Sequence, residues 1–227
     1  MRIGVLGSGV VGRTLGAKMA SLGNEVALGT RNVDTLMARA DLGRGETVSF
    51  AGWLERNPGV TPAPFAAAAE HGDIVVNATS GDAALAALGP AGAPSLDGKI
   101  LIDVSNPLDF SAGFPPTFLV SNTDSLGEQI QRAFPRARVV KTLNTVNAAV
   151  MVEPGALGDG DHHVFVGGND QAAKDEVAGI LRDWLGWRHV LDLGDITTAR
   201  GTEMYLALWT RVLGAVGSPA FNIKIVR

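Results

Sequence analysis

The sequence contains no cysteine among its 227 residues, and this absence removes several kinds of chemistry at once. A chain without thiols forms no disulfide, offers no thiolate nucleophile and builds no zinc–thiolate site. Lysine and arginine do not cluster and the formal net charge is −4, so neither nucleic acid nor an anionic membrane surface is an expected partner. No apolar run approaches the length of a membrane span. Because the first residues resemble a short strand rather than a signal peptide, we expect a cytoplasmic protein.

Side chains for acid–base catalysis are also scarce. The one tyrosine, Tyr205, is followed four residues later by Trp209, so the Tyr-x-x-x-Lys pair of short-chain dehydrogenases is absent. His162 and His163 are adjacent in an expected strand, where neighbouring side chains point to opposite faces and do not easily share one metal ion. Lys141 could donate a proton or have a structural role. We predict no metal site and assign no residue a catalytic role.

What the sequence does contain is an alternation of short apolar strands and helices. We expect strands at 2–6, 25–29, 73–78, 99–104, 138–143, 162–168 and 187–193, and helices at 11–22, up to about 40, 63–70, 82–88, 124–134, 170–185 and 197–216. Segments 41–62 and 107–123 are rich in glycine and proline and are expected to be loops. The pattern predicts an α/β, Rossmann-type doubly wound fold with a mainly parallel sheet. Residues 1–147 would form the dinucleotide-binding core, and 148–227 a small C-terminal extension packed on it.

The glycines that follow the first strand predict a ligand. Gly7-Ser8-Gly9-Val10-Val11-Gly12 has the spacing G-x-G-x-x-G between a strand and a helix. In this motif the first glycine makes the tight turn, the second lets the backbone approach a pyrophosphate and the third lets helix and strand pack closely. The helix N-terminus then presents its unpaired N–H groups to the anion. The motif therefore predicts a bound dinucleotide.

The end of the second strand indicates which dinucleotide is bound. Enzymes that prefer NAD usually carry Asp or Glu at this point, whereas those that use NADP have an arginine nearby. This chain has Gly29-Thr30-Arg31-Asn32, and its first acid comes only at Asp34. A guanidinium suits the 2′-phosphate because it offers several donors in a fixed plane. We predict NADP(H), with a solvated loop arginine as the alternative explanation of Arg31.

The scarcity of acid–base groups favours one class of reaction. Hydride transfer between a nicotinamide and a second ring needs two flat rings held face to face with water excluded, and little proton chemistry from the protein. We therefore expect an oxidoreductase with a small-molecule redox substrate.

Nearly the whole chain resembles the NADP-dependent coenzyme F420 reductases, the F420:NADP oxidoreductase family. It is also similar to the NADPH-binding domain of the STEAP metalloreductases. The likeness is carried by the segments MRIGVLGSGVVGRTLG, LGTRN, DIVVNATSGDA, LIDVSNPLDF, VVKTLNTVNA and ARGTEMYLALWTRVLGAVGSPAFNIKIVR. The resemblance implies hydride transfer between NADP(H) and a deazaflavin (coenzyme F420) or a flavin-type acceptor. It also implies a homodimer in which the C-terminal segment helps to close the site.

The resemblance further implies a set of cofactor-binding residues. These are Gly7, Ser8, Gly9, Val10, Val11 and Gly12 at the pyrophosphate; Thr30, Arg31 and Asn32 at the 2′-phosphate; Ala78, Thr79 and Ser80 at the ribose; and Asn106, Asn144, Val146 and Ala148 at the nicotinamide. Two of these have ordinary structural alternatives, because Asn106 before Pro107 can make a turn and Asn144 can bond to backbone groups. Deazaflavin reductases carry a histidine where this chain has Asn144, so a deazaflavin, a flavin and another acceptor all stay open as the second substrate. Asn144 is a candidate residue of the substrate pocket.

Two other functions and one structural alternative stay open. A redox sensor that binds NADPH without turning it over would also lack acid–base groups. A β-hydroxyacid or pyrroline-carboxylate type reductase, acting on another small acceptor, begins with the same turn but has a long all-helical C-terminal half, which this chain is too short to contain. Apolar residues cover more than one face of the last helix (Met204, Leu206, Leu208, Val212, Leu213 and Val216). They fit either the homodimer or burial within the subunit.

Overall fold

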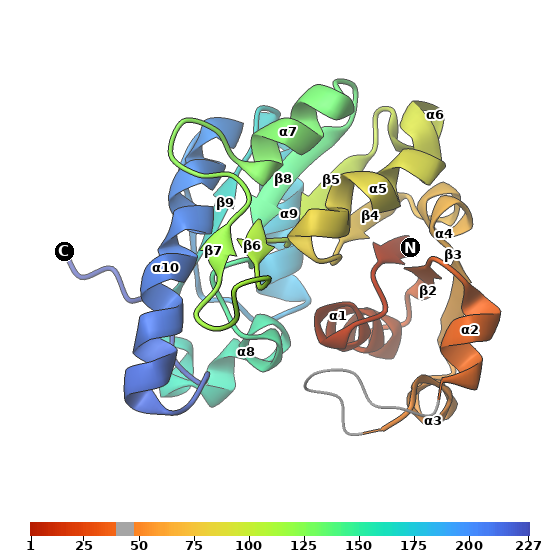
Figure 1. Ribbon diagram of the computed structural model, residues 1–227, viewed down its shortest axis with the longest axis horizontal. Helices are drawn as coiled ribbons and strands as arrows, with labels where there is room; N and C mark the ends of the chain where they lie inside the picture. Colours follow the sequence, from red (N-terminus) through yellow and green to blue (C-terminus); the bar gives the residue numbers. More distant parts are fainter. Residues whose placement is uncertain (40–47) are drawn as a thin grey trace.

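The computed structural model describes residues 1–39 and 48–227, and these residues form one large sheet between two layers of helices (Figure 1). Within the described residues this sheet has eight strands in the order β10-β9-β8-β5-β4-β1-β2-β3. Their bounds are β1 Arg2–Leu6, β2 Glu25–Thr30, β3 Val60–Pro64, β4 Ile74–Asn77, β5 Ile100–Asp103, β8 Arg138–Thr142, β9 His163–Gly167 and β10 His189–Asp192. A separate antiparallel pair is formed by β6 Leu108–Asp109 and β7 Thr117–Phe118.

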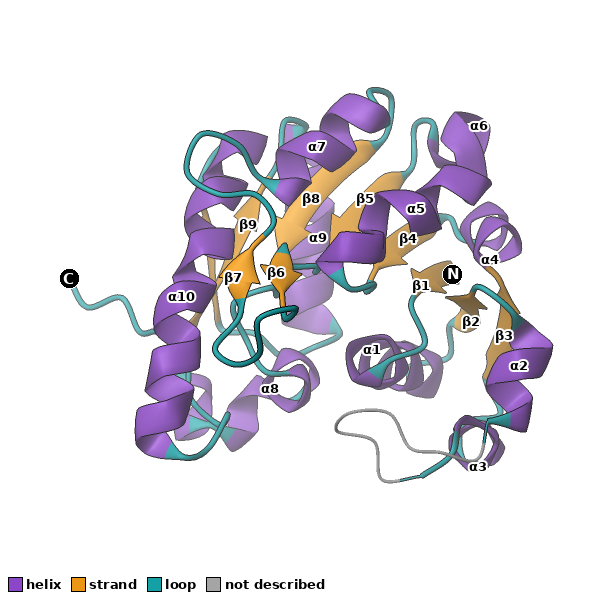
Figure 2. Ribbon diagram, in the orientation of Figure 1, coloured by secondary structure: helices purple, strands orange, loops and turns teal. Residues whose placement is uncertain are grey.

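The helices cover both faces of the sheet (Figure 2). Their bounds are α1 Val10–Ser21, α2 Val33–Ala38, α3 Phe50–Glu55, α4 Phe65–His71, α5 Ala84–Leu88, α6 Gly92–Leu96, α7 Leu126–Ala133, α8 Ala148–Val152, α9 Gln171–Asp183 and α10 Ala199–Val216. Short 3-10 turns lie at Gly81–Ala83, Gly89–Ala91, Pro154–Ala156, Gly158–Gly160 and Ile196–Thr198. One core cluster joins α1, α8 and α9 to the sheet, and a second joins α4, α5 and α7 to the opposite face.

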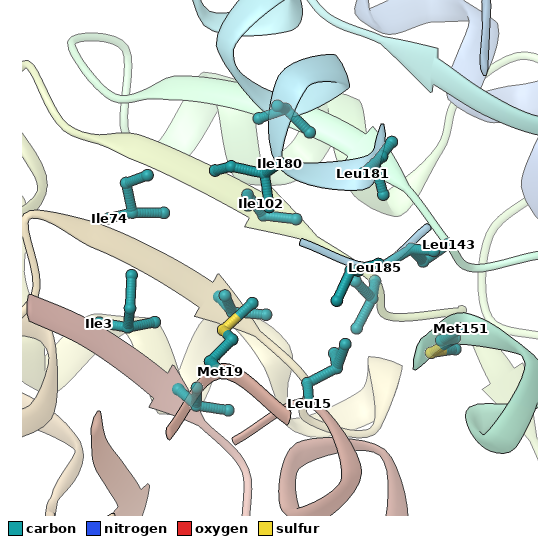
Figure 3. Packing of buried hydrophobic residues seen from close by; sticks show 14 of the residues in the cluster. Ile3, Leu15, Met19, Ile74, Ile102, Leu143, Met151, Ile180, Leu181 and Leu185 are labelled. Carbon is teal, nitrogen blue, oxygen red and sulfur yellow. The ribbon is translucent and has the colours of Figure 1, made fainter. Parts of the chain in front are cut away.

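The first of these clusters shows why the α1 segment is a helix. Leu15 and Met19 recur one turn apart, and both are buried in the cluster that also contains Ile3 and Ile74 of the sheet (Figure 3). On the same face, Leu181 of α9 belongs to the same cluster. Apolar side chains from β1 and β4 and from these two helices therefore form one cluster on this face of the sheet.

Strand direction confirms the predicted fold class. β1 pairs in parallel with β2 and β4, and the ladder continues in parallel to β3 on one side and through β5 to β8 on the other. β9 runs antiparallel to β8, and β10 is parallel to β9. The sheet is thus continuous across residue 147, and the division into a core and an extension stays a prediction.

The structure corrects several element boundaries. Part of the loop predicted at 41–62 is ordered: α3 lies within 48–62, where the Ser49 hydroxyl accepts from the N–H of Gly52 at 3.2 Å, and β3 follows it. Residues 41–47, and the expected helix end near 40, lie outside the described residues. The helix predicted at 63–70 begins at Phe65, because Ala63 and Pro64 still belong to β3. The loop predicted at 107–123 contains β6 and β7, and α6 and α8 were not predicted.

The last helix, α10, has both buried and exposed apolar residues. Leu206 is buried, Val212 and Leu213 are half-buried, and Met204, Leu208 and Val216 are exposed. The homodimer therefore stays a prediction, with an apolar surface available for it. None of the helices that the structure describes combines the length and apolar character needed to cross a bilayer.

Candidate functional site

The candidate site lies where the order of the sheet changes direction. The chain passes from β1 to β2 and β3 on one side and then returns to β4 on the other side of β1. In open parallel sheets, ligands bind at the carboxyl ends of the strands beside such a switch point. The segments that follow β1, β2, β4 and β5 begin at Gly7, Arg31, Ala78 and Val104, and most of the predicted site residues lie there.

Two of the three turn glycines are required by the packing of the protein itself. Gly7 has φ +120°, and a Cβ on it would lie 2.4 Å from the carbonyl oxygen of Ala78. A Cβ on Gly12 would lie only 1.8 Å from the carbonyl oxygen of Gly7. Both contacts are to backbone, which cannot move aside cheaply. These two glycines would therefore be needed even in a protein with no ligand.

Gly9 differs from them, and this difference points to a ligand. A Cβ on Gly9 would have none of the described atoms within 4 Å, and its φ of −78° is open to any residue. Gly9 is also the N-cap of α1, whose first turn has no acidic residue and no side-chain cap among the described residues. The first N–H groups of the helix are therefore available to an anion. The absence of a side chain at Gly9 fits a phosphate group that approaches the backbone.

Arg13, which sequence analysis missed, supports this turn from behind. Its Nε donates to the carbonyl oxygen of Ser8 at 2.9 Å, although the side chain is buried. The guanidinium lies 5.0 Å from the ring centroid of Phe50 and 5.9 Å from that of Trp53, both on α3. Cation–π contacts of this kind hold a buried arginine in place. The unpredicted helix α3 therefore helps to fix the glycine turn.

Pocket A, a cleft of about 670 Å³, begins at Gly7–Gly9 and extends to the residues after β2. Its far end is lined by Thr30, Arg31 and Asn32, and no carboxylate follows β2 at this point. Asn32 also caps α2, because its side-chain oxygen accepts from the N–H of Thr35 at 2.8 Å. The residues present fit the 2′-phosphate of NADP(H), which needs donors and no nearby carboxylate.

A second arginine lines pocket A and was also missed. Asn32, Thr35, Leu36 and Arg39 all face the pocket, at the spacing i, i+3, i+4, i+7 of one helix face. Arg31 precedes α2 and Arg39 is its C-cap, so the two arginines line pocket A from opposite ends of this short helix. This periodicity, read outward from Arg31, is the sequence signal that would have found it.

Pocket B, of about 660 Å³, continues pocket A along the sheet edge. The two share Ala78, Thr79, Ser80 and Asp82, so together they form one cleft. The rest of pocket B is lined by Val11, by Gly81, by Val104, Ser105 and Asn106 after β5, and by Leu108, Asp109, Phe110, Ser111 and Leu119 of the β6–β7 segment. A dinucleotide that starts in pocket A would extend toward the residues that the two pockets share, with the rest of pocket B beyond them.

Asn106 and Asn144 form a reciprocal pair at the ends of β5 and β8. The Asn106 amide donates to the Asn144 carbonyl oxygen at 2.8 Å, and the Asn144 amide donates to the Asn106 side-chain oxygen at 2.9 Å. Leu143, directly before Asn144, has φ +60°, which is uncommon for a leucine. Asn106 lines pocket B, whereas Asn144, Val146 and Ala148 are buried and line neither pocket. Their contact with a cofactor or substrate stays a prediction, as do those of Val10 and Gly12, which also line neither pocket.

A buried polar network lies beneath the junction of the two pockets. Lys141 of β8 is 2.8 Å from Asp103 Oδ2 and 2.8 Å from Glu203 Oε1 of α10. Burial alone would lower the pKa of Lys141, but the attraction of the two carboxylates outweighs it and raises the pKa. The lysine thus stays protonated at neutral pH. Because Lys141 lines neither pocket, the structure gives it a supporting place rather than contact with a ligand.

The histidines lie elsewhere. His162 is buried with its ring edge against Trp187 at 5.1 Å, while His163 stacks on His189 at 5.0 Å, so the two adjacent rings do face different ways. Among the residues that the structure describes, no group of three or more histidine, aspartate or glutamate side chains is arranged to hold a metal ion.

A third cavity, of about 710 Å³, is at the opposite edge of the sheet, where β8 begins. Its arginines already have partners: Arg132 bonds to Asp124 at 2.7 Å, Arg136 pairs with Asp97, and Arg138 donates to the Gly98 carbonyl oxygen at 2.9 Å. This cavity shares no lining residue with pockets A and B, which remain the candidate site.

Comparisons with known proteins indicate the family to which this chain is related. The family model described as NADP oxidoreductase, coenzyme F420-dependent, matches residues 2–107. A protein from Arthrobacter sp. FB24, provisionally described as an F420-dependent NADP reductase, is 56% identical over 100% of both chains, with a TM-score of 0.95. Metalloreductase STEAP3 of Rattus norvegicus is 28% identical over 204 residues, which cover 89% of this chain and only 36% of that protein. An imine reductase from Myxococcus stipitatus, in complex with NADP+, shares the fold with a TM-score of 0.62 at 14% identity, over 95% of this chain and 64% of that one.

Proposed function

Because this chain belongs to the coenzyme F420-dependent NADP oxidoreductases, we propose that it transfers a hydride between NADP(H) and a deazaflavin such as coenzyme F420. The observation that carries the proposal is the single cleft made by pockets A and B, which starts at the bare face of Gly9 and ends beside the β6–β7 segment. Such a cleft has room for a dinucleotide and for part of a second molecule. A flavin is the alternative acceptor.

Pocket A supports the cofactor half of this proposal. The N–H groups at the start of α1 would bind the pyrophosphate, while the Ser8 carbonyl oxygen already accepts from Arg13 at 2.9 Å. Thr30 and Arg31 would hold the 2′-phosphate at the end of β2. When bound there, NADPH supplies the hydride.

Pocket B supports the acceptor half. Val11, Leu108, Phe110 and Leu119 give it an apolar lining, and Thr79 and Ser105 give it hydroxyls close to the strand ends. In the direction of acceptor reduction, NADPH, the oxidised ring and one proton become NADP+ and the reduced ring. The hydride carries both electrons, and the proton comes from solvent. The chain's part is to hold two flat rings together and to keep water from between them.

Turnover is the direct test. Purified protein is mixed with NADPH and oxidised coenzyme F420, and the nicotinamide and deazaflavin absorbance bands are followed together. We expect both to fall at equal molar rates, much faster with NADPH than with NADH. Parallel reactions with FMN and riboflavin identify a flavin acceptor instead. Tight NADPH binding with no turnover of any of these rings would contradict the proposal and favour a redox sensor.

A further inference from the structure

The floor of pocket B carries two hydroxyls, those of Thr79 and Ser105, and the network beneath them determines which way each hydroxyl points. Thr79 follows β4 and lines both pockets, and Ser105 follows β5 and lines pocket B. Asp103 and Asn77, the last residues of the two strands, are completely buried below them. A hydroxyl has one proton to donate, so its partner inside the protein decides what it can offer to a ligand.

Asp103 is the fixed point of this arrangement. Its Oδ2 accepts from Lys141 at 2.8 Å, and its Oδ1 accepts from the Ser105 hydroxyl at 2.6 Å and the Ser105 N–H at 3.2 Å. Both oxygens of Asp103 thus face N–H donors, which leaves this side chain in the role of acceptor. The proton of the Ser105 hydroxyl must therefore point down to Asp103.

A chain of hydrogen bonds continues from Asp103 through Asn77 to Thr79 and fixes the direction of the Thr79 hydroxyl in the same way. Asn77 has its amide nitrogen 2.9 Å from Asp103 Oδ1, and only the NH2 group of an amide can donate to a carboxylate. The orientation of this amide is thus fixed, and its oxygen faces the Thr79 hydroxyl at 2.7 Å. An amide oxygen cannot donate, so Thr79 must. Both hydroxyls therefore donate their protons inward, to Asp103 and to Asn77. Ser105 is only 3% exposed and its hydroxyl also accepts from the Asn77 amide at 3.3 Å, so Thr79 is the hydroxyl that can present a lone pair to a ligand.

Charge around pocket B adds to this selectivity. Asp82 and Asp109 line the pocket, and the described residues of its lining include no lysine, arginine or histidine. The Ser111 N–H donates to the Asp109 carboxylate at 2.8 Å and, with the Ser111 hydroxyl, lowers the pKa of Asp109. Asp109 therefore stays negative at neutral pH. A carboxylate or phosphate on a substrate would meet negative charge here, with no cationic side chain among the described lining residues to neutralise it.

We propose that Thr79 is a specificity-determining acceptor, which selects an uncharged ring that points an N–H donor at the floor of pocket B. Asn77 is the positioning residue that fixes the polarity of Thr79. The inference rests on the proposed function for the kind of molecule that enters, because flavin and deazaflavin rings both carry an N–H between two carbonyl groups at N3. It predicts that this N–H edge, rather than a charged tail, is what pocket B recognises.

A matched pair of probes tests this without any turnover. Lumiflavin has the free N3–H, and 3-methyllumiflavin has a methyl group in its place. Binding of each to the full chain, in saturating NADP+, is followed by quenching of probe fluorescence. We expect the wild type to bind lumiflavin about five- to tenfold more tightly, as befits one hydrogen bond. Equal affinity for the two probes, or binding of neither, would overturn the inference.

Variants assign the preference to its residues. Thr79→Val removes the hydroxyl with little change of shape and is expected to reduce the preference to about twofold or less, whereas Thr79→Ser keeps the hydroxyl and should retain it. Asn77→Leu frees the Thr79 proton, so we expect the preference to fall while affinity for 3-methyllumiflavin stays the same, whatever happens to thermal stability. An unchanged preference in Thr79→Val would overturn the assignment. A chain that shows the preference but reduces neither F420 nor a flavin would lose the proposed function and keep this inference.

Discussion

Glu203 of α10 and Lys141 of β8 form an ion pair of 2.8 Å in which both side chains are almost completely shielded from water. The carboxylate also accepts from the N–H groups of Leu126 at 2.8 Å and Gly127 at 3.0 Å, at the start of α7. The Glu203 carboxylate thus pairs with a lysine of β8 and also accepts hydrogen bonds from the first N–H groups of α7. The C-terminal helix is tied to the strand ends that form the candidate site.

Removing the cation from this network should be costly. In Lys141→Met, Asp103 and Glu203 stay buried with no positive partner. We expect a loss of about 3–5 kcal/mol in the free energy of unfolding, measured by chemical denaturation. The matched control is Arg2→Met, which breaks the exposed Arg2–Asp73 pair and should cost about 1 kcal/mol or less. Similar losses in the two variants would show that the buried network adds little.

The turn glycines should separate folding from binding. Gly12→Ala puts a methyl group into the Gly7 carbonyl oxygen, so we expect a lower melting temperature and a loss of about 1–3 kcal/mol or more. Gly9→Ala meets no described atom and should melt like the wild type. Its methyl group would keep a phosphate from the backbone, and NADPH affinity should fall by at least about tenfold in a fluorescence titration. Normal NADPH binding by Gly9→Ala would contradict the interpretation that a phosphate group approaches the backbone at Gly9.

Arg31 should distinguish NADPH from NADH. If its guanidinium pairs with the 2′-phosphate, Arg31→Ala loses about 1.5–3 kcal/mol of NADPH binding, roughly ten- to hundredfold, and hardly changes NADH binding. Calorimetric titration of both cofactors measures this directly. Arg211→Ala, an exposed arginine on α10 that lines neither pocket, is the control and should change neither affinity. Equal losses for the two cofactors would remove Arg31 from the 2′-phosphate site.

The C-terminal segment should loosen in mild acid. The N–H of Ile225 donates to His163 Nδ1 at 3.3 Å, and the N–H of His163 donates to the Ile223 carbonyl oxygen at 2.9 Å. Burial lowers the pKa of His163 and the neighbouring His189 adds to this, with smaller effects from His162 and Lys224 in the same direction and from Asp161 in the opposite one. The folded segment therefore favours the neutral ring. This contribution to stability is present above the ordinary histidine value of 6.5 and is lost as the pH falls through that value to the lower folded pKa.

Hydrogen exchange across this pH range provides the measurement. We expect the protection factor of the Ile225 amide to decrease below about pH 6.5, while amides in the β1 strand keep theirs. His163→Gln removes the titrating group and should show no step. A protection factor in the wild type that does not change with pH would contradict the role of His163.

Local patterns carried most of what the sequence could predict. The strand, glycine turn and helix at Arg2–Ser21 were readable because the signals are neighbours in the chain, and the structure confirms these elements. β3 was missed because Pro62 and Pro64 are typical of loops, and only its place at the sheet edge allows them.

Partners far apart in the sequence were not predictable. The reciprocal bonds of Asn106 and Asn144 span 38 residues, and the partners of Lys141 lie on β5 and α10. Sequence analysis could treat each of these residues only as a single polar side chain beside a strand. Arg39 is different, because the helical spacing that begins at Asn32 would have predicted that Arg39 lies on the same helix face and lines pocket A.

The prolines of β3 also determine which hydrogen-bonding groups this edge of the sheet exposes. Val60 turns its N–H away from β2, toward the carbonyl oxygen of Asn57, and Pro62 and Pro64 follow at the alternate positions that point the same way. Proline carries no amide hydrogen, so this border has no spare donor with which to recruit a foreign strand. At high concentration, stacking of one copy onto another through this border, the usual first step toward fibrils, is disfavoured by the covalent structure of two residues.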